Sequence, residues 1–108
     1  MSPLDTASLS TLITQCFFLS GDGRLSAEKR SAFLVAGKRL RGLLVNLISA
    51  QFDDTTQEVL DANQQMQAAS DKVKQLSVSL KKLDDTLNTV NTVVQTLDGL
   101  LSLAAKFV

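Results

Sequence analysis

The sequence predicts an all-α protein in which an N-terminal helical hairpin leads into a long coiled-coil or bundle-forming helix. Three observations carry this prediction. Apolar residues recur at heptad spacing from Val59 to Val108, a Gly-rich turn at residues 20–23 separates two earlier helical patterns, and 44% hydrophobic with 20% charged residues is typical of a chain that folds. We therefore divide the chain into a hairpin, residues 1–51, and a long helix, residues 52–108.

The first helix is predicted from about Leu4 to Leu19. Pro3 is tolerated in a first helical turn, and Ser2 before it can act as the cap. Its apolar side chains fall at helical spacing and predict one buried face: Leu9, Leu12, Ile13, Cys16 and Phe17. The run Ser20–Gly23 then breaks the helix, because glycines on both sides of an Asp can supply a positive φ and a tight reversal.

A calcium site is the alternative at this turn. Residues 22–26 resemble the second half of an EF-hand loop, in which an Asp, a Gly and an apolar residue are in step. In that alignment Phe18 occupies the first ligand position and Lys29 stands where a bidentate Glu is required. The ligand set is therefore incomplete, and a plain helix-helix turn is favoured.

The second helix is predicted over Ala27 to Gln51, with Ser26 as its cap. One side of it is apolar: Phe33, Gly37, Leu40, Leu44, Leu47 and Ile48. We expect the first helix to fold back onto this side, with Gly37 allowing the two backbones to approach closely.

The long helix carries apolar residues at heptad positions a and d, counted from Val59 as a. As one straight helix it would be about 75 Å long at 1.5 Å per residue, too long for the rest of the chain to cover. We therefore expect self-association, or pairing with another helical protein, through the strongest part of this stripe: Val73, Leu76, Leu80, Leu83, Leu87, Val90, Val94, Leu97, Leu101 and Ala104.

Two interpretations are open at residues 52–58. Thr55 and Glu58 have the spacing of a capping box, which indicates a new helix. The heptad phase, however, continues backwards through Phe52 and Ile48 to Val45, which favours one helix continuous with the preceding one.

The charges at positions g and e disfavour a parallel two-stranded coiled coil. In parallel register Glu58 would face Asn63, and Lys72 would face Ser77, so no pair of opposite charges forms. In the last two heptads Val93, Leu100 and Phe107 make the g positions apolar as well. An antiparallel pair, or a bundle in which this wide face meets at least two neighbours, fits better.

Charge is divided between the two halves of this neutral chain. Residues 1–50 hold six basic and three acidic side chains, a net charge of +3, and the remainder carries −3. The basic residues of the second predicted helix indicate possible contact with an anionic membrane surface: Lys29, Arg30, Lys38, Arg39 and Arg41. Nucleic acid is disfavoured as a partner, because no aromatic residues are interleaved with these cations and the overall charge is zero.

The sequence points away from catalysis. It has no His, a single cysteine, Cys16, and no arrangement of a nucleophile with a base, of metal ligands or of phosphate-binding glycines. We therefore expect no enzyme activity, no metal and no cofactor. The first ten residues show no basic signal-peptide start, which makes a cytoplasmic protein, with membrane association as an option, the expectation.

Two functional hypotheses follow from these patterns. The first is a non-enzymatic structural or adaptor protein that self-assembles through a coiled coil or helical bundle. The alternative is a membrane-active amphipathic helical protein that binds lipid or forms part of a helical pore-forming assembly, with either the basic helix or the face from Val90 to Val108 in contact with lipid.

Overall fold

The computed structural model describes residues 4–49, 57–76 and 78–105, and four α-helices make up most of these ranges. They are α1 (Thr6–Ser20), α2 (Ala27–Ser49), α3 (Gln57–Gln75) and α4 (Leu83–Ala105). No strand occurs in the ranges described. The prediction of an all-α protein is therefore confirmed.

Helix α1 is capped by Asp5 and not by the predicted Ser2, which with Pro3 lies outside the described residues. The Asp5 carboxylate accepts hydrogen bonds from the Ser8 amide at 2.9 Å and the Ser8 hydroxyl at 2.6 Å. The Asp5 amide in turn donates to Asn63 Oδ1 of α3 at 2.7 Å. One residue therefore both starts α1 and ties it to the third helix.

We predict that Asp5→Ala lowers the free energy of unfolding by about 1 kcal/mol at neutral pH, the usual loss for an N-cap. Hydrogen bonds from the hydroxyl and amide of Ser8 hold the pKa of Asp5 below its ordinary value of 3.8. A carboxyl group with a lowered folded-state pKa stabilises the protein above its unfolded pKa, and this stabilisation is lost as the pH falls through the folded-state value.

Urea unfolding at a series of pH values checks this prediction. The difference between wild type and Asp5→Ala should shrink as the pH falls below 3.8. Asp5→Asn keeps the capping oxygen without its charge, so it should retain most of the stability at neutral pH. A difference that stays constant down to strongly acidic pH would show that the Asp5 charge plays no part.

The turn between α1 and α2 is held by a side-chain clamp. Asp22 accepts hydrogen bonds from the Arg24 backbone amide and from its guanidinium group, with a shortest contact of 2.7 Å. Gly21 has φ of −108°, and the described residues include no glycine with positive φ, so the predicted left-handed glycines are wrong. The Ser26 hydroxyl accepts from the Lys29 amide at 3.2 Å, which confirms Ser26 as the cap of α2.

Gly37 brings α1 and α2 close together, as the sequence predicts. A Cβ added there would lie 3.2 Å from Phe17 Cε1 and 3.3 Å from Cys16 Cβ, both of α1. Gly42, five residues further along α2, has no such neighbour within 4 Å. The two glycines of one helix therefore provide a matched pair for mutation.

We predict opposite effects of the same substitution at these two positions. Gly37→Leu should destabilise the protein by about 1–3 kcal/mol, because the added side chain overpacks the contact between α1 and α2. Gly42→Leu should be neutral or stabilise by up to about 0.8 kcal/mol, because it only replaces a poor helix former. Denaturant unfolding of both variants checks this, and equal effects would contradict the close approach at Gly37.

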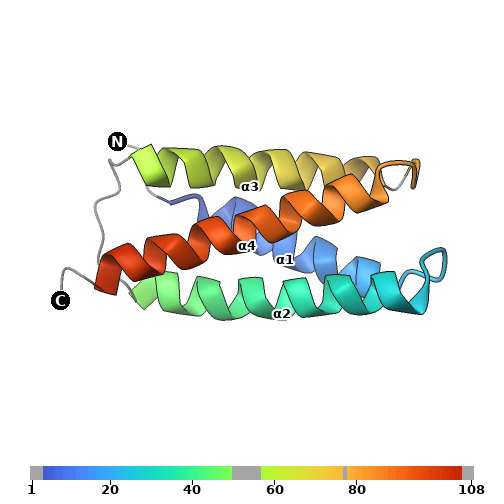
Figure 1. Ribbon diagram of the computed structural model, residues 1–108, viewed down its shortest axis with the longest axis horizontal. Coiled ribbons are helices and arrows are strands. Elements are labelled where there is room, and N and C mark those ends of the chain that lie inside the picture. Colours follow the sequence, from blue (N-terminus) through green and yellow to red (C-terminus); the bar gives the residue numbers. More distant parts are fainter. Residues whose placement is uncertain (1–3, 50–56, 77, 106–108) are drawn as a thin grey trace.

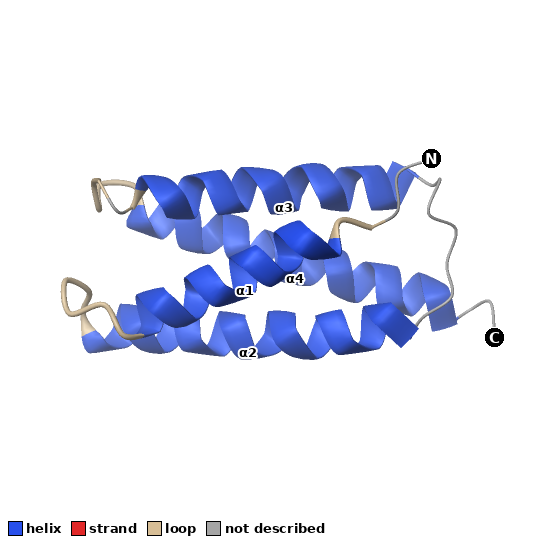
Figure 2. Ribbon diagram, turned by 180° about the vertical axis from the view of Figure 1, so that it is seen from behind, coloured by secondary structure: helices blue, strands red, loops and turns tan. Residues whose placement is uncertain are grey.

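The four helices form a bundle in which each contacts two others (Figure 1). Helix α1 contacts α2 and α3, and α4 contacts the same two helices, so α1 and α4 occupy opposite corners. The turns after α1 and after α3 lie at the same end of the bundle, and Figure 2 shows the same arrangement from behind. The longest extent of the molecule is 44 Å.

The expected single helix over 59–108 is not observed. Helix α3 ends at Gln75, the chain reverses, and α4 begins at Leu83 and packs back against α3. The physical reason is that two shorter halves of the stripe, placed beside α1 and α2, can be covered within one chain. The prediction that the helix continues through residues 52–58 falls largely on residues 50–56, which lie outside the described part of the chain.

All four helices contribute to one core. Its largest fully buried side chains include Phe33 and Leu40 of α2, Met66 of α3 and Leu97 of α4. Helix α4 also buries Val93 and Leu100 at heptad position g, and it packs against two helices, as its wide apolar face predicts.

Candidate functional site: the outer face of α2

The residues predicted for self-association lie in the core of their own chain. Val73, Leu76, Val90, Val94 and Leu97 are buried. Four more pack against that core while partly exposed: Leu80, Leu83, Leu87 and Leu101. The side chain of Ala104 lies outside the described part. In this fold the stripe needs no second chain to cover it, so the main ground for self-association is removed, and self-association itself stays a prediction.

The side of α2 that points away from the bundle combines exposed aliphatic and basic side chains. Val35, Val45 and Ile48 are 54%, 61% and 69% exposed. They share this side with exposed basic residues and a glycine. We call the following set the outer face of α2: Val35, Lys38, Arg39, Arg41, Gly42, Val45 and Ile48.

Helical geometry places these residues on one surface. Val35, Lys38, Gly42 and Val45 are three or four residues apart, which aligns them along a single stripe. The acidic residue of α2, Glu28, lies in its first turn, more than two turns before Lys38. The outer face of α2 therefore has a positive charge that no acidic side chain of its own helix offsets.

Three of the five predicted basic residues lie on this face, and two do not. Lys29 Nζ forms an ion pair with Asp84 Oδ1 of α4 at 2.6 Å, and this hydrogen bond and the Asp84 charge raise the pKa of Lys29. Arg30 is partly buried, and its Nε lies in the interior without a hydrogen-bond partner. Lys29 is paired with α4 and Arg30 is partly buried, so the candidate cationic site consists of Lys38, Arg39 and Arg41.

The three remaining cations are available at the surface. None of the ion pairs found among the described residues includes Lys38, Arg39 or Arg41. The Arg41 guanidinium lies 5.4 Å from the centroid of the Phe17 ring of α1, a cation-π arrangement that fixes its position at the edge of the face. The partly buried Phe17 ring lies beside Arg41, and the aliphatic stems of the three cations add apolar surface around their charged groups.

The exposure of Val45 and Ile48 differs from the sequence prediction. Ile48 was expected on the buried side of the second helix, and both residues on a backward continuation of the heptad stripe. In the structure Leu43 and Leu47 face the core at this end of α2 instead. The signal that could have identified them is their spacing from Arg41, because Val45 follows it by four residues and Ile48 by seven, which places both on the side of the helix that carries this cation.

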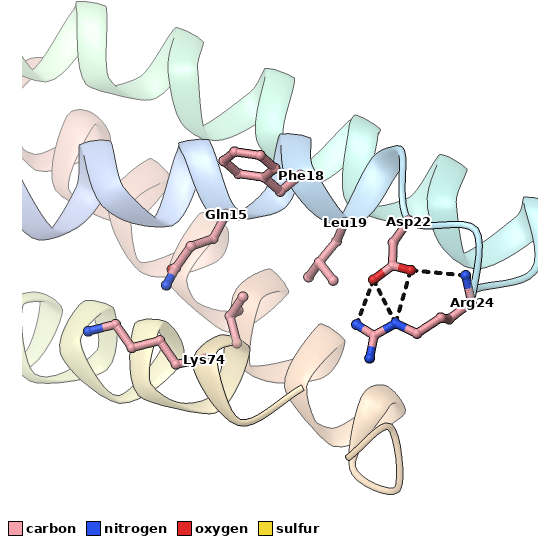
Figure 3. Close-up of a pocket in the computed structure, with 7 residues that line it drawn as sticks. Gln15, Phe18, Leu19, Asp22, Arg24 and Lys74 are labelled. Carbon is pink, nitrogen blue, oxygen red and sulfur yellow. Dashed lines mark hydrogen bonds and ion pairs between the residues drawn. The ribbon is translucent and has the colours of Figure 1, made fainter. Parts of the chain in front are cut away.

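A pocket of about 310 Å³ lies between the C-terminal ends of α1 and α3 (Figure 3). Its apolar wall is made by Phe18, Leu19 and Val73, and its remaining lining residues are Gln15, Asp22, Arg24 and Lys74. Gln15 Nε2 donates to the Ser70 carbonyl at 3.4 Å, while its Oε1 is buried without a partner. The pocket can accept a small apolar group.

Neither the Asp22 carboxylate nor the Cys16 thiol is available as a reactive group near this pocket. The Asp22 carboxylate is bound on both oxygens by Arg24, which lowers the pKa of Asp22 to about 2. Burial raises the pKa of the Cys16 thiol to about 12, so the thiol stays protonated and unreactive at neutral pH. Within the described ranges no group of three or more His, Cys, Asp or Glu residues gathers that could hold a metal ion.

None of the described helices has the length and apolar character that a membrane crossing requires. On the outer face of α2, exposed aliphatic and cationic side chains lie together.

Comparison with known proteins gives no counterpart for this bundle: no family model matches the chain, and neither a curated protein sequence nor a solved structure matches it.

Proposed function

We propose that the protein is a non-enzymatic helical bundle that binds an anionic lipid surface through the outer face of α2. The observation that carries this proposal is the coincidence of Val35, Val45 and Ile48, all more than half exposed, with three surface cations on one helical face. An amphipathic helix that lies in the plane of a membrane interface combines these same features, aliphatic side chains for the acyl boundary and cations for the headgroups.

The expected contributions to the free energy of binding support reversible binding to an anionic membrane. A cation near an anionic membrane contributes about 1 kcal/mol, so three contribute about 3 kcal/mol, or slightly more than a hundredfold in affinity. Burial of the aliphatic side chains adds to this term, at about 25 cal/mol per Å² of apolar surface removed from water. Because the cationic part is screened within about 8 Å at physiological salt, binding should weaken as salt is added.

Docking through this face ranks above self-association through the heptad residues. The outer face of α2 is exposed in the folded bundle, so lipid can reach it without any rearrangement. Self-association through the stripe would require buried residues such as Val90 and Leu97 to leave the core of their own chain. The alternative in which the face from Val90 onward contacts lipid needs the same rearrangement.

Vesicle flotation tests the proposal. The full chain should float with vesicles of phosphatidylcholine and phosphatidylserine, and should stay at the bottom with phosphatidylcholine alone. Lys38→Glu/Arg39→Glu should abolish flotation, because two attractive contacts become repulsive. Val45→Ser/Ile48→Ser should weaken it while leaving its salt dependence in place.

A matched control separates this face from a general charge effect. Lys81→Glu/Lys82→Glu makes the same change in net charge at two exposed positions of the turn between α3 and α4. This variant should float as the wild type does. The proposal fails if the wild type binds no anionic vesicles, if it binds neutral vesicles equally well, or if both charge-reversal variants lose binding to the same extent. Circular dichroism of each variant shows whether it remains folded.

A further inference from the structure

The two reversing turns of this bundle are built from different kinds of residues. The turn after α1 contains Gly21 and Gly23 and the clamp between Asp22 and Arg24. The segment 76–82 after α3 reads Leu-Ser-Val-Ser-Leu-Lys-Lys and contains no Gly, Pro, Asn or Asp. Ser is the one common turn residue that it contains, and the Ser79 hydroxyl accepts a hydrogen bond from the Lys81 amide at 3.3 Å. The reversal between α3 and α4 is therefore specified more weakly by its own residues than the turn after α1.

Helical hydrogen bonding continues into this segment from both sides. The Ser79 amide donates to the Gln75 carbonyl at 3.1 Å, which is the spacing of four residues found in an α-helix. On the far side the Thr86 amide donates to the Lys82 carbonyl at 2.9 Å with the same spacing. In the described part of this segment no residue has a positive φ. Hydrogen bonds with four-residue spacing therefore reach Ser79 on one side of the turn and resume from Lys82 on the other.

The heptad phase also passes through the turn without a shift. Leu76 and Leu83 occupy d positions, and Leu80 occupies the a position between them. Helices α3 and α4 could each face the core in any phase, since a hairpin does not require its two helices to share one. A common phase is what a single straight helix needs to keep its apolar stripe on one side.

We propose that residues 78–82 act as a hinge, and that the hinge allows this chain to pair with a second copy of itself. When the hinge straightens, α3 and α4 form one helix over residues 57–105, about 74 Å long at 1.5 Å per residue. Helix α3 then stays with α1 and α2 of its own chain, and α4 completes the bundle of the second chain. Two chains related by a two-fold axis exchange α4 reciprocally, which is domain swapping.

Every contact that holds α4 in the bundle can form again between chains. These include Lys72 Nζ to Asp85 Oδ2 at 3.0 Å, Gln65 Oε1 to Thr96 Oγ1 at 2.6 Å, and the ion pair of Lys29 with Asp84. The core contacts of α4 are regained as well. The balance between the monomer and the swapped dimer is therefore set by the hinge and by protein concentration. This inference does not depend on lipid binding, since the outer face of α2 is exposed in both forms.

The experiment measures the distance between residues 61 and 98 within one chain. Asp61 and Asp98 are exposed, and Asp61 and Gly99 line the same pocket, so spin labels at both positions are close together in the monomer. In a straight helix they are about 55 Å apart, since 37 residues separate them. Asp61→Cys/Asp98→Cys accepts the labels, while Cys16 is fully buried and stays unlabelled.

The labelled protein is refolded at high concentration with excess unlabelled wild type, and the dimer is isolated by size-exclusion chromatography with light scattering. We expect a dimer with a distance near 55 Å within the labelled chain, as calculated for a continuous helix. A dimer that retains the short distance is an ordinary contact between closed bundles, and it overturns the proposal. The absence of any dimer after concentrated refolding also overturns it.

Hinge variants give an independent readout. Val78 is 89% exposed, so a change there acts mainly on backbone preference. A change at Ser79 also removes the hydroxyl that accepts from the Lys81 amide in the turn. Val78→Ala/Ser79→Ala should favour the helix and lower the dissociation constant of the dimer by about tenfold or more, because each dimer contains two hinges. Val78→Gly/Ser79→Gly should raise it by a similar factor. Equal or same-sign shifts in the two variants would contradict the hinge.

Discussion

Phe33→Ala should remove most of the stability of the bundle. Phe33 is the largest fully buried side chain and lies in α2, a helix that contacts both α1 and α4. Truncation of a buried Phe to Ala costs about 3–5 kcal/mol, because apolar contacts are lost and a cavity remains. Since the whole free energy of unfolding of such a domain is about 5–15 kcal/mol, the variant should be close to unfolding at room temperature.

Urea unfolding followed by circular dichroism measures this loss. The matched control is Phe18→Ala, because Phe18 is 77% exposed on α1 and should change the free energy of unfolding by less than about 0.5 kcal/mol. A Phe33→Ala variant as stable as Phe18→Ala would mean that the core is not centred on α2.

Leu97→Ala should lower the free energy of unfolding by about 2–5 kcal/mol, and the loss should not depend on protein concentration. Leu97 belongs to the predicted self-association stripe, and it is fully buried within one chain. If the stripe were covered by a second chain, unfolding would include dissociation, and the midpoint would rise with concentration. The same substitution therefore separates cover within a chain from cover between chains.

The control for Leu97 is Leu103→Ala on the same helix, since Leu103 is exposed and should lose much less. Unfolding of both variants and the wild type is measured over about a hundredfold range of dilute concentrations, all chosen below the dissociation constant measured for the swapped dimer. An unfolding midpoint that shifts with protein concentration in this range would show that a second chain covers the apolar stripe.

Local signals predicted the N-terminal half well. Ser26 caps α2, Gly37 allows close contact with α1, and Phe33, Leu40 and Leu47 face the core at spacings of seven. Each of these follows from chemistry within a few residues of the position concerned. The cap of α1 was misplaced because Asp5 and Ser2 both have the side chains of a good cap, and the choice depends on Asn63, which α3 supplies.

The hairpin of α3 and α4 could not be predicted from such signals. The segment 76–82 has no Gly, Pro, Asn or Asp and preserves the heptad phase through Leu80, so a straight helix and a hairpin satisfy the same pattern. The hairpin is chosen by the availability of α1 and α2 to cover both halves of the stripe. That is a property of the whole chain and not of any window within it.

Only the part of the candidate site that depends on helical periodicity could be predicted from the sequence. Lys38, Arg39 and Arg41 are exposed because they lie opposite the core residues of α2, which periodicity alone indicates. Lys29 was counted with them, but the bundle brings Asp84 of α4 to within 2.6 Å of it. This ion pair joins residues 55 positions apart in the sequence, so it depends on the topology of the bundle, and no local pattern in α2 predicts it.

Small-angle X-ray scattering of the dilute monomer tests most directly whether one chain covers its own apolar stripe. The bundle predicts a radius of gyration close to 14.0 Å and a longest extent near 44 Å. A straight helix over 59–108 is about 75 Å long and by itself has a radius of gyration of about 22 Å. A monomer with that elongated scattering profile would contradict the account.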